Sequence, residues 1–136
     1  MRSRKALVLW ALVIAYAAGI FVLSASSVPP PAEAVSIRVG DKALHLLEYA
    51  VIALLLSLAV AATPSPRVRA RDSWIALAAA VLYAATDELH QAFVPGRDAS
   101  LLDFAADAAG AAMGAAVHAA WSWASRRAAV SGTSPR

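Results

Sequence analysis

Four long apolar segments, separated by shorter polar stretches, organise this chain. They cover residues 6–24, 43–62, 73–93 and 101–124. Because an α-helix needs about 17 to 25 mostly apolar residues to cross a bilayer, each segment is long enough to span one. The pattern predicts an all-α integral membrane protein, a bundle of four transmembrane helices that forms a single domain over residues 1–125. Residues 126–136 are predicted to form a disordered cytoplasmic tail.

Composition favours the membrane as the solvent. The 136 residues are 60% hydrophobic and 15% charged, which is too apolar for an ordinary soluble domain of this size. The absence of cysteine excludes disulfides and thiol nucleophiles. The net charge is only +3, and the basic residues border apolar segments, so we expect no nucleic-acid partner.

The first apolar segment has an alternative interpretation as a secretory signal. Arg2, Arg4 and Lys5 precede it, and small residues follow it from Ser24 onward. Its apolar stretch is longer than the usual signal core of about 7 to 15 residues, which favours a retained helix. Cleavage would leave three spans and move the amino terminus to the other side of the membrane.

The distribution of basic residues predicts the orientation. Nine of the twelve lie in the amino-terminal tail, the loop between the second and third segments, and the carboxy-terminal tail. By the positive-inside tendency, we expect a multi-pass membrane protein with both termini in the cytoplasm. Eight of the nine carboxylates fall on the opposite, outer side, and this acidic bias needs a reason other than topology.

Polar side chains at helical spacing mark the outer ends of three segments, and residues four apart share a helix face. These positions are Asp41, Lys42, His45, Glu48 and Tyr49 in the second segment, Asp87, Glu88, His90 and Gln91 in the third, and Asp103 and Asp107 in the fourth. Because isolated charges inside a membrane are costly, we expect the groups to pair, bind an ion or face water. They predict one polar site at the outer face.

The loop between the third and fourth segments adds a candidate anion-binding group. Pro95 and Gly96 predict a turn, and Arg97 is the only basic residue of the loop. An Arg side chain can bind a carboxylate or phosphate with two parallel hydrogen bonds. Asp98 and Ser100 are predicted to cap the start of the fourth helix.

These residues together resemble the VanZ-like family of bacterial membrane proteins, which is named after a teicoplanin-resistance protein. The similar pieces are Ser24, Asp41-Lys42 with His45 and Glu48-Tyr49, the stretch from Asp87 to Asp103, and Asp107 with Gly110. The resemblance implies a small multi-pass protein of the bacterial inner membrane whose polar site faces outward, with a link to glycopeptide tolerance in the namesake and no established reaction. The Asp at position 107, where Asn is common in the family, and the Ala-rich fourth segment depart from the pattern.

We interpret the outer site as a pocket that binds or processes an anionic or sugar-bearing lipid or cell-envelope precursor. His45, Asp87 and Glu88 are the candidate catalytic residues, and the other polar residues are expected to bind the substrate: Asp41, Lys42, Glu48, Tyr49, His90, Gln91, Arg97, Asp103 and Asp107. Carboxylates and imidazole also suit a divalent metal, but no ligand motif specifies one.

There are two alternatives: the first requires no catalysis, and the second requires no lipid ligand. In the first, the protein is an accessory or structural subunit whose polar groups only hold helices together, with a homo-oligomer formed through Gly110 and Gly114. In the second it is a transporter, although a polar site at one side rather than at the midplane argues against this. The sequence leaves open whether the protein is an enzyme.

Overall fold

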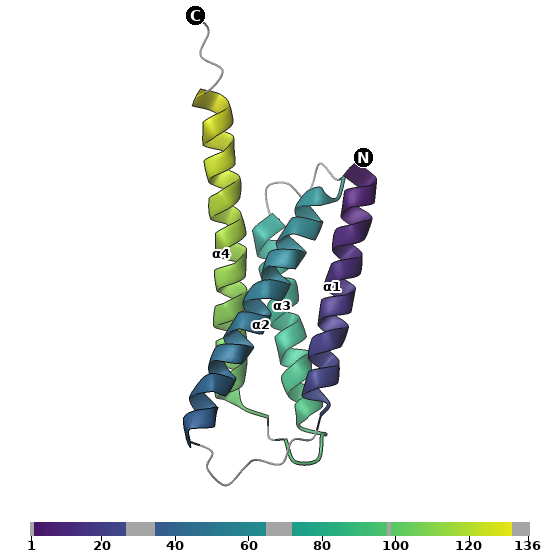
Figure 1. Ribbon diagram of the computed structural model, residues 1–136, viewed down its shortest axis with the longest axis vertical. Coiled ribbons are helices and arrows are strands. Elements are labelled where there is room, and N and C mark those ends of the chain that lie inside the picture. Colours follow the sequence, from purple (N-terminus) through teal and green to yellow (C-terminus); the bar gives the residue numbers. More distant parts are fainter. Residues whose placement is uncertain (1, 27–34, 65–71, 98, 132–136) are drawn as a thin grey trace, which may run out of the picture.

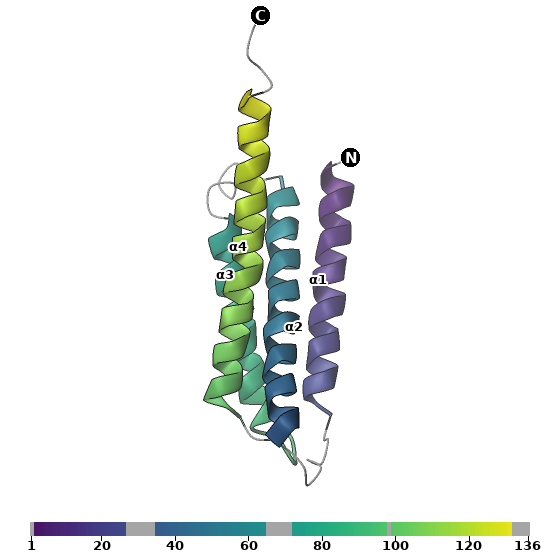
Figure 2. The same ribbon diagram turned by 60° about the vertical axis from the view of Figure 1, so that its left-hand side comes forward.

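The computed structural model describes residues 2–26, 35–64, 72–97 and 99–131, with side chains described from residue 4 to 129 except at 27–41, 65–72 and 98. These residues form four helices and no strand: α1 (Arg2–Ser24), α2 (Val35–Ala62), α3 (Asp72–Gln91) and α4 (Leu101–Ser131). The predicted all-α architecture with four helices is therefore confirmed. The amino and carboxyl termini lie at the same end of the bundle (Figures 1 and 2).

The central helix is α2, which contacts each of the other three. Its packing against α4 is closest at two glycines, where the backbones almost touch. A β-carbon at Gly110 would lie 2.0 Å from the carbonyl oxygen of Leu46, and one at Gly114 would lie 2.1 Å from that of Ala50. Small residues allow such close approach between membrane helices. This face of α4 is thus occupied by α2 of the same chain, so a homo-oligomer, which stays a prediction, would need another surface.

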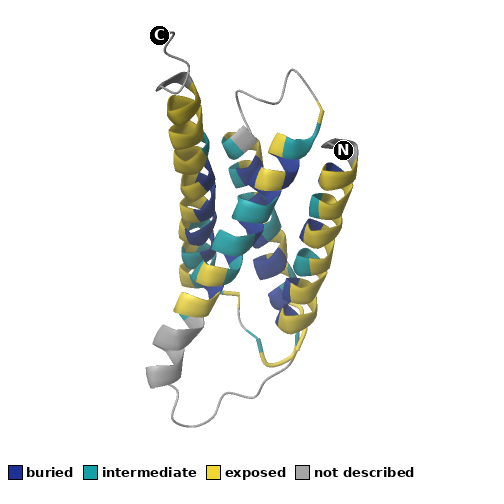
Figure 3. Cartoon of the chain, turned by 45° about the horizontal axis from the view of Figure 1, so that its top comes forward, coloured by how far each residue is buried: buried dark blue, intermediate teal, exposed yellow. Residues whose placement is uncertain are grey.

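The bundle is apolar on its outside, and alanines and polar side chains make up much of its interior beside a few larger residues such as Ile52. Its core includes Ala53, Ala80 and Ala111, whereas large apolar residues such as Leu7 and Leu82 are about 70% exposed. Figure 3 shows the same division, with buried positions along the inner faces and exposed positions on the outside. A surface of this kind is suited to lipid rather than to water.

Two helices are long and apolar enough to cross a membrane, over Arg4–Ser24 and Lys42–Ala62. In α3, Asp87 and Glu88 lower the apolar character near its end, and α4 consists largely of Ala and Gly, which are only weakly apolar. Two spans, with a lipid-suited surface, indicate a membrane protein. Four spans with cytoplasmic termini stay a prediction.

The helix ends differ from the predicted segments at three places. Helix α2 begins at Val35, well before the apolar segment, and α3 ends at Gln91 because the chain turns at Gly96, whose φ is 83°. Helix α4 continues to Ser131, so the prediction of a disordered tail is wrong for residues 126–131, while 132–136 lie outside the described residues. Ala and Arg favour a helix in this stretch, and the guanidinium of Arg127 lies 4.1 Å from the ring centre of Trp123.

Candidate functional site

The predicted polar residues gather at the end of the bundle opposite the two termini. The carboxyl ends of α1 and α3 and the amino-terminal halves of α2 and α4 meet there (Figures 1 and 2). Four ionisable side chains in this region are at most 8% exposed: His45, Asp87, Glu88 and Asp107. Together with buried Tyr49 and Gln91, we call these residues the polar cluster.

Helices α2 and α4 each contribute one member of a buried pair. His45 Nδ1 lies 3.0 Å from an oxygen of Asp107, whose residue is fully buried. Nearer the end of the bundle, Lys42 Nζ forms an ion pair with Asp103. The two acids are four residues apart on α4, and their partners are three apart on α2, so each pair of residues shares a helix face. The close approach of α4 to α2 at Gly110 brings the two faces together.

Asp87 connects α3 to α1. One of its oxygens accepts a hydrogen bond of 2.8 Å from the hydroxyl of Ser24 and a longer one of 3.3 Å from the amide of Gln91. Its other oxygen is buried without a hydrogen-bond partner among the described residues. Sequence analysis did not predict the Ser24 contact, although a serine at the end of an apolar helix, at the depth of the outer carboxylates, is a signal for it.

Glu88 connects α3 to the start of α4. The backbone N–H of Ser100 donates a hydrogen bond of 2.7 Å to one carboxylate oxygen, and the second oxygen has no partner in the described part of the chain. The Ser100 hydroxyl accepts from the N–H of Asp103 at 3.3 Å, so its predicted capping role is confirmed. Asp98, the other predicted cap, lies outside the described residues.

The polar cluster contains a set of groups suited to holding a cation. One ligand atom each from His45, Glu88 and Asp107 lie within 4.8 Å of one another, and all three residues are buried. Buried polar atoms normally have hydrogen-bond partners. Within the described chain, the Tyr49 hydroxyl and one oxygen each of Asp87, Glu88 and Asp107 have none. The site is therefore acidic and incompletely satisfied.

Three further predicted site residues lie beside the cluster or outside what is described. Glu48 is half-buried and lies within electrostatic range of Tyr16 on α1. The ring of His90 stacks on Phe21, with 4.5 Å between ring centres. The side chain of Asp41 is outside the described residues.

Arg97 contacts backbone carbonyl groups rather than a carboxylate. Its guanidinium donates to the carbonyl oxygens of Leu23 and Ser26, each at 3.3 Å, and so fastens the loop after α3 to the end of α1. An Arg side chain has five N–H donors, so these two bonds leave others for a ligand. The predicted anion-binding role of Arg97 stays a prediction.

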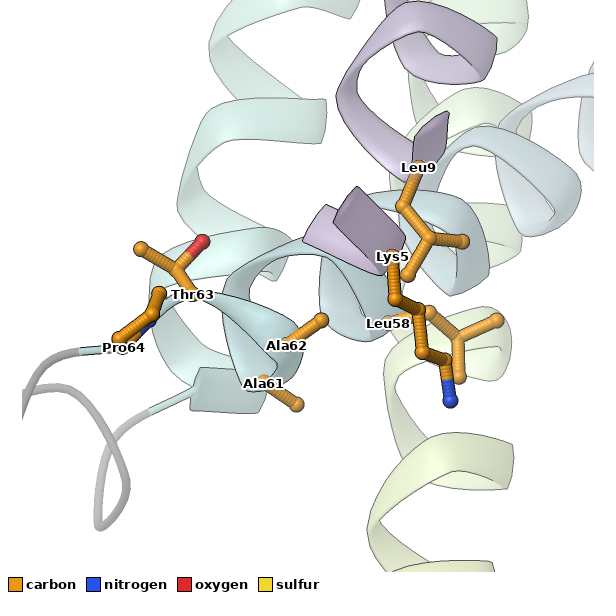
Figure 4. A pocket seen from close by; sticks show the side chains of 7 residues that line it. All are labelled: Lys5, Leu9, Leu58, Ala61, Ala62, Thr63 and Pro64. Atoms are coloured by element: carbon orange, nitrogen blue, oxygen red, sulfur yellow. The ribbon is translucent and has the colours of Figure 1, made fainter. Parts of the chain in front are cut away.

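A pocket opens beside the polar cluster, between the end of α3 and the start of α4. Its volume is about 360 Å³, and it is lined by Ala85, Glu88, Ala99, Ser100, Leu101 and Phe104. A pocket of about 490 Å³ lies at the opposite end of the bundle, between α1 and α2 (Figure 4). Among the described residues that line that second pocket, Lys5 is the only charged one, so it is remote from the cluster and chemically plain.

Comparison with known proteins gives a family but no close relative. A family model described as VanZ/LLP1 matches residues 13–122, which confirms the resemblance inferred from the sequence motifs. No curated protein and no solved structure matches the chain. The matched range contains the whole polar cluster. It also contains every residue named as lining the two pockets, except Lys5 and Leu9.

Proposed function

We propose a function from the premise that the chain belongs to the VanZ/LLP1 family: it binds, and acts on, an anionic or sugar-bearing lipid or precursor of the bacterial cell envelope. The observation that carries the proposal is the burial of four ionisable side chains at one end of an otherwise apolar bundle. Such groups are costly at membrane depth, so a protein that only had to span the bilayer would gain nothing from them. Binding of a polar ligand would account for these buried ionisable groups.

The pocket beside Glu88 supports an amphipathic ligand. Leu101, Phe104 and two alanines form an apolar wall, and Glu88 and Ser100 supply polar groups at one side. Ligand pockets typically have volumes of about 300 to 1,000 Å³, so this one suits the junction of a headgroup and a chain rather than a whole lipid. The rest of the chain would lie in the membrane against the apolar outer surface.

Within this proposal the residues have distinct roles. His45, Asp87 and Glu88 are the acid and base candidates, and Gln91 and Asp103 position the substrate. The contact between His45 Nδ1 and Asp107 fixes the orientation of the imidazole ring. Lys42 and Arg97, at the rim of the cluster, would bind the anionic headgroup.

The orientation that the proposal needs is a four-span inner-membrane protein with the polar end outward. The chain has no cysteine, so single cysteines report accessibility directly. Ala99 and Ser125 are exposed near opposite ends of the bundle. In intact cells, a membrane-impermeant maleimide should label Ala99→Cys and spare Ser125→Cys. The reverse result would place the polar cluster in the cytoplasm.

Lipid mass spectrometry of the purified protein tests the ligand. We expect the wild type to retain an anionic or glycosylated lipid and His45→Ala to lose at least about tenfold of it, which corresponds to about 1.4 kcal/mol. His118→Ala is the matched control, because His118 is buried on α4 away from the cluster, where its nitrogens contact Ser73 and Ser122. Equal lipid profiles for wild type and His45→Ala would reject the pocket.

A structural role is the second candidate function, and one observation favours it. Three of the polar contacts join different helices: Ser24 to Asp87, Lys42 to Asp103 and His45 to Asp107. An accessory subunit would use them to fix its own helices for a partner protein. If His45→Ala, Asp87→Ala and Arg97→Ala all fail to fold, this role is favoured; if they fold and lose the lipid, the binding pocket is.

The link to teicoplanin rests on the namesake of the family alone. The proposal includes it because an outward site for an envelope precursor lies where glycopeptides act. Deletion of the gene, with complementation by wild type or by Asp87→Asn, tests the link as a change in the inhibitory teicoplanin concentration. An unchanged concentration would separate this protein from antibiotic tolerance without affecting the lipid proposal.

A further inference from the structure

We propose that His45, Glu88 and Asp107 bind one divalent transition-metal ion at the polar end of the bundle. The three residues come from α2, α3 and α4, so the ion would join three helices at a single point. No sequence motif identifies these three residues, because they lie far apart along the chain and share no local spacing. Only the fold brings them together.

The geometry of the three residues is close to that of a coordination sphere. Their ligand atoms lie within 4.8 Å of one another. Protein ligands bind Zn²⁺ at about 2.0 to 2.2 Å in tetrahedral geometry, so two ligands of one ion are roughly 3.3 to 3.6 Å apart. Atoms that start at the 4.8 Å limit must therefore approach by about 1 to 1.5 Å, which rotation of the two carboxylate side chains can supply.

Unpartnered atoms inside the cluster provide independent support. Glu88 is 8% exposed and Asp107 is fully buried, and each has one carboxylate oxygen without a hydrogen-bond partner in the described chain. Buried carboxylates normally have their oxygens satisfied, because leaving them bare in an apolar site is costly. A bound cation would satisfy both free oxygens at once.

Charge balance points the same way. Asp103 shows how a carboxylate in this region is compensated, since it is paired with Lys42. Glu88 and Asp107 lie in the electrostatic range of each other and of Asp103, and no described Lys or Arg forms an ion pair with either of them. With a neutral imidazole on His45, a divalent cation would bring the three groups to zero net charge.

The donor set limits the choice of ion. One imidazole nitrogen with two carboxylates suits Zn²⁺ or Mn²⁺ better than the all-oxygen environment preferred by Ca²⁺ or Mg²⁺. Three protein ligands also leave at least one coordination position open, as in catalytic metal sites. With the ion bound, the imidazole of His45 and the carboxylate of Glu88 are ligands and no longer acids or bases, and Asp87 remains as the acid–base candidate. Glu88 borders the pocket between α3 and α4, so the open position is next to the space proposed for the lipid headgroup. A phosphate oxygen is the natural ligand there, and this last link rests on the proposed function.

Metal analysis of the intact chain in detergent micelles tests the site directly. After stripping with a chelator and separate reloading with ZnCl₂ or MnCl₂, we expect about one ion per chain of one metal by mass spectrometry of the digested sample. Glu88→Gln and Asp107→Asn keep the side-chain shape and should weaken binding at least about tenfold. Asp87→Asn is the matched control, since Asp87 is a buried carboxylate of the same cluster outside the three-residue set. It should retain the ion.

A measurement on the wild type alone tests the site even if the variants fail to fold. Zn²⁺ or Mn²⁺ that binds only the folded chain raises the unfolding temperature with concentration, whereas Ca²⁺ at the same concentration should not. Absence of a stoichiometric ion and of any such shift would overturn the metal site. So would an equal loss of metal in Asp87→Asn and the other two variants.

The outcomes for metal and lipid are separable. The metal measurements contain no added lipid, and the lipid analysis can be repeated on chelator-treated protein. If the protein retains lipid but takes up no ion on reloading, the metal site is overturned and the proposed function stands. Metal binding without lipid would overturn the lipid and leave the ion in place.

Discussion

The two ends of this bundle handle polar groups in opposite ways. At the end that bears the termini, His118 has a serine hydroxyl near each ring nitrogen, and the Trp10 ring nitrogen donates to the hydroxyl of Thr63. These contacts are neutral. Among the described residues, no carboxylate is buried at this end. At the other end, carboxylates and a histidine are buried, and several oxygens have no partner among the described residues.

This difference distinguishes topology from function. The predicted orientation of the helices in the membrane would account for the basic residues near the termini without any particular contacts. It would not account for the acidic end, because acidic residues contribute little to orientation. Buried groups that are costly and incompletely paired are common at binding and catalytic sites, where function and the stability of the fold conflict, and this is why the proposed function is placed at the acidic end.

The largest expected effect comes from breaking the packing that assembles the acidic end. Gly110→Ala would put a β-carbon 2.0 Å from the Leu46 carbonyl, and α4 would have to move away from α2. We expect a loss of about 3 kcal/mol or more of unfolding free energy, at the upper end of overpacking costs. Thermal unfolding in detergent measures it. Gly19→Ala is the control, because its β-carbon would meet nothing within 4 Å; similar losses in both variants would show that the seam is unimportant.

A smaller effect compares one serine from each end. Ser24→Ala removes the 2.8 Å hydrogen bond to the buried Asp87 carboxylate and should cost about 1.5 to 3 kcal/mol, as expected for a bond to a charged group. Ser73→Ala removes the 3.3 Å contact with His118 and should cost about 0.5 to 1 kcal/mol, as for a neutral bond. Thermal unfolding of both variants under one detergent condition gives the comparison. Equal losses would mean that the charge on Asp87 adds nothing.

Stability should rise, not fall, when charge is removed from an incompletely paired carboxylate. In metal-free protein, Glu88→Gln keeps the shape of the side chain and removes a buried charge within range of Asp103 and Asp107. We expect a gain of about 1 kcal/mol, in the manner of active-site substitutions that trade function for stability. A higher unfolding temperature together with loss of the lipid would fit a functional site. A lower one would mean that Glu88 serves mainly to hold α3 to Ser100.

The fold and much of the site could be predicted because both depend on local periodicity. Apolar length predicted the four helices, and four-residue spacing placed Asp103 and Asp107 on the face that meets Lys42 and His45. Contacts that depend on how whole helices rotate and slide could not be predicted in this way. The Ser24 bond to Asp87 joins residues 63 positions apart, and nothing in either segment specifies the partner.

Helix α4 was harder to predict for the same reason. The spacing of Gly110 and Gly114 indicates that a helix is approached closely without showing by which helix, so the homo-oligomer through these residues stays a prediction. The structure places α2 of the same chain there. The end of α4 was misjudged because polar and charged residues leave a membrane segment without ending its helix. Helix propensity continued it to Ser131.

The smallest expected effect concerns the end that bears the termini, where the polar contacts are neutral. Thr63→Val removes the hydroxyl that accepts from Trp10 at 3.1 Å and donates to the carbonyl of Ala59 at 2.9 Å, while keeping a side chain of similar size. Because Trp10 is partly exposed and can bond to water or lipid headgroups instead, we expect a loss of only about 0.5 kcal/mol by thermal unfolding. The lipid content should be unchanged. A loss as large as that of Ser24→Ala would show that neutral contacts far from the carboxylates stabilise the bundle equally, and the contrast between its ends would then concern charge alone.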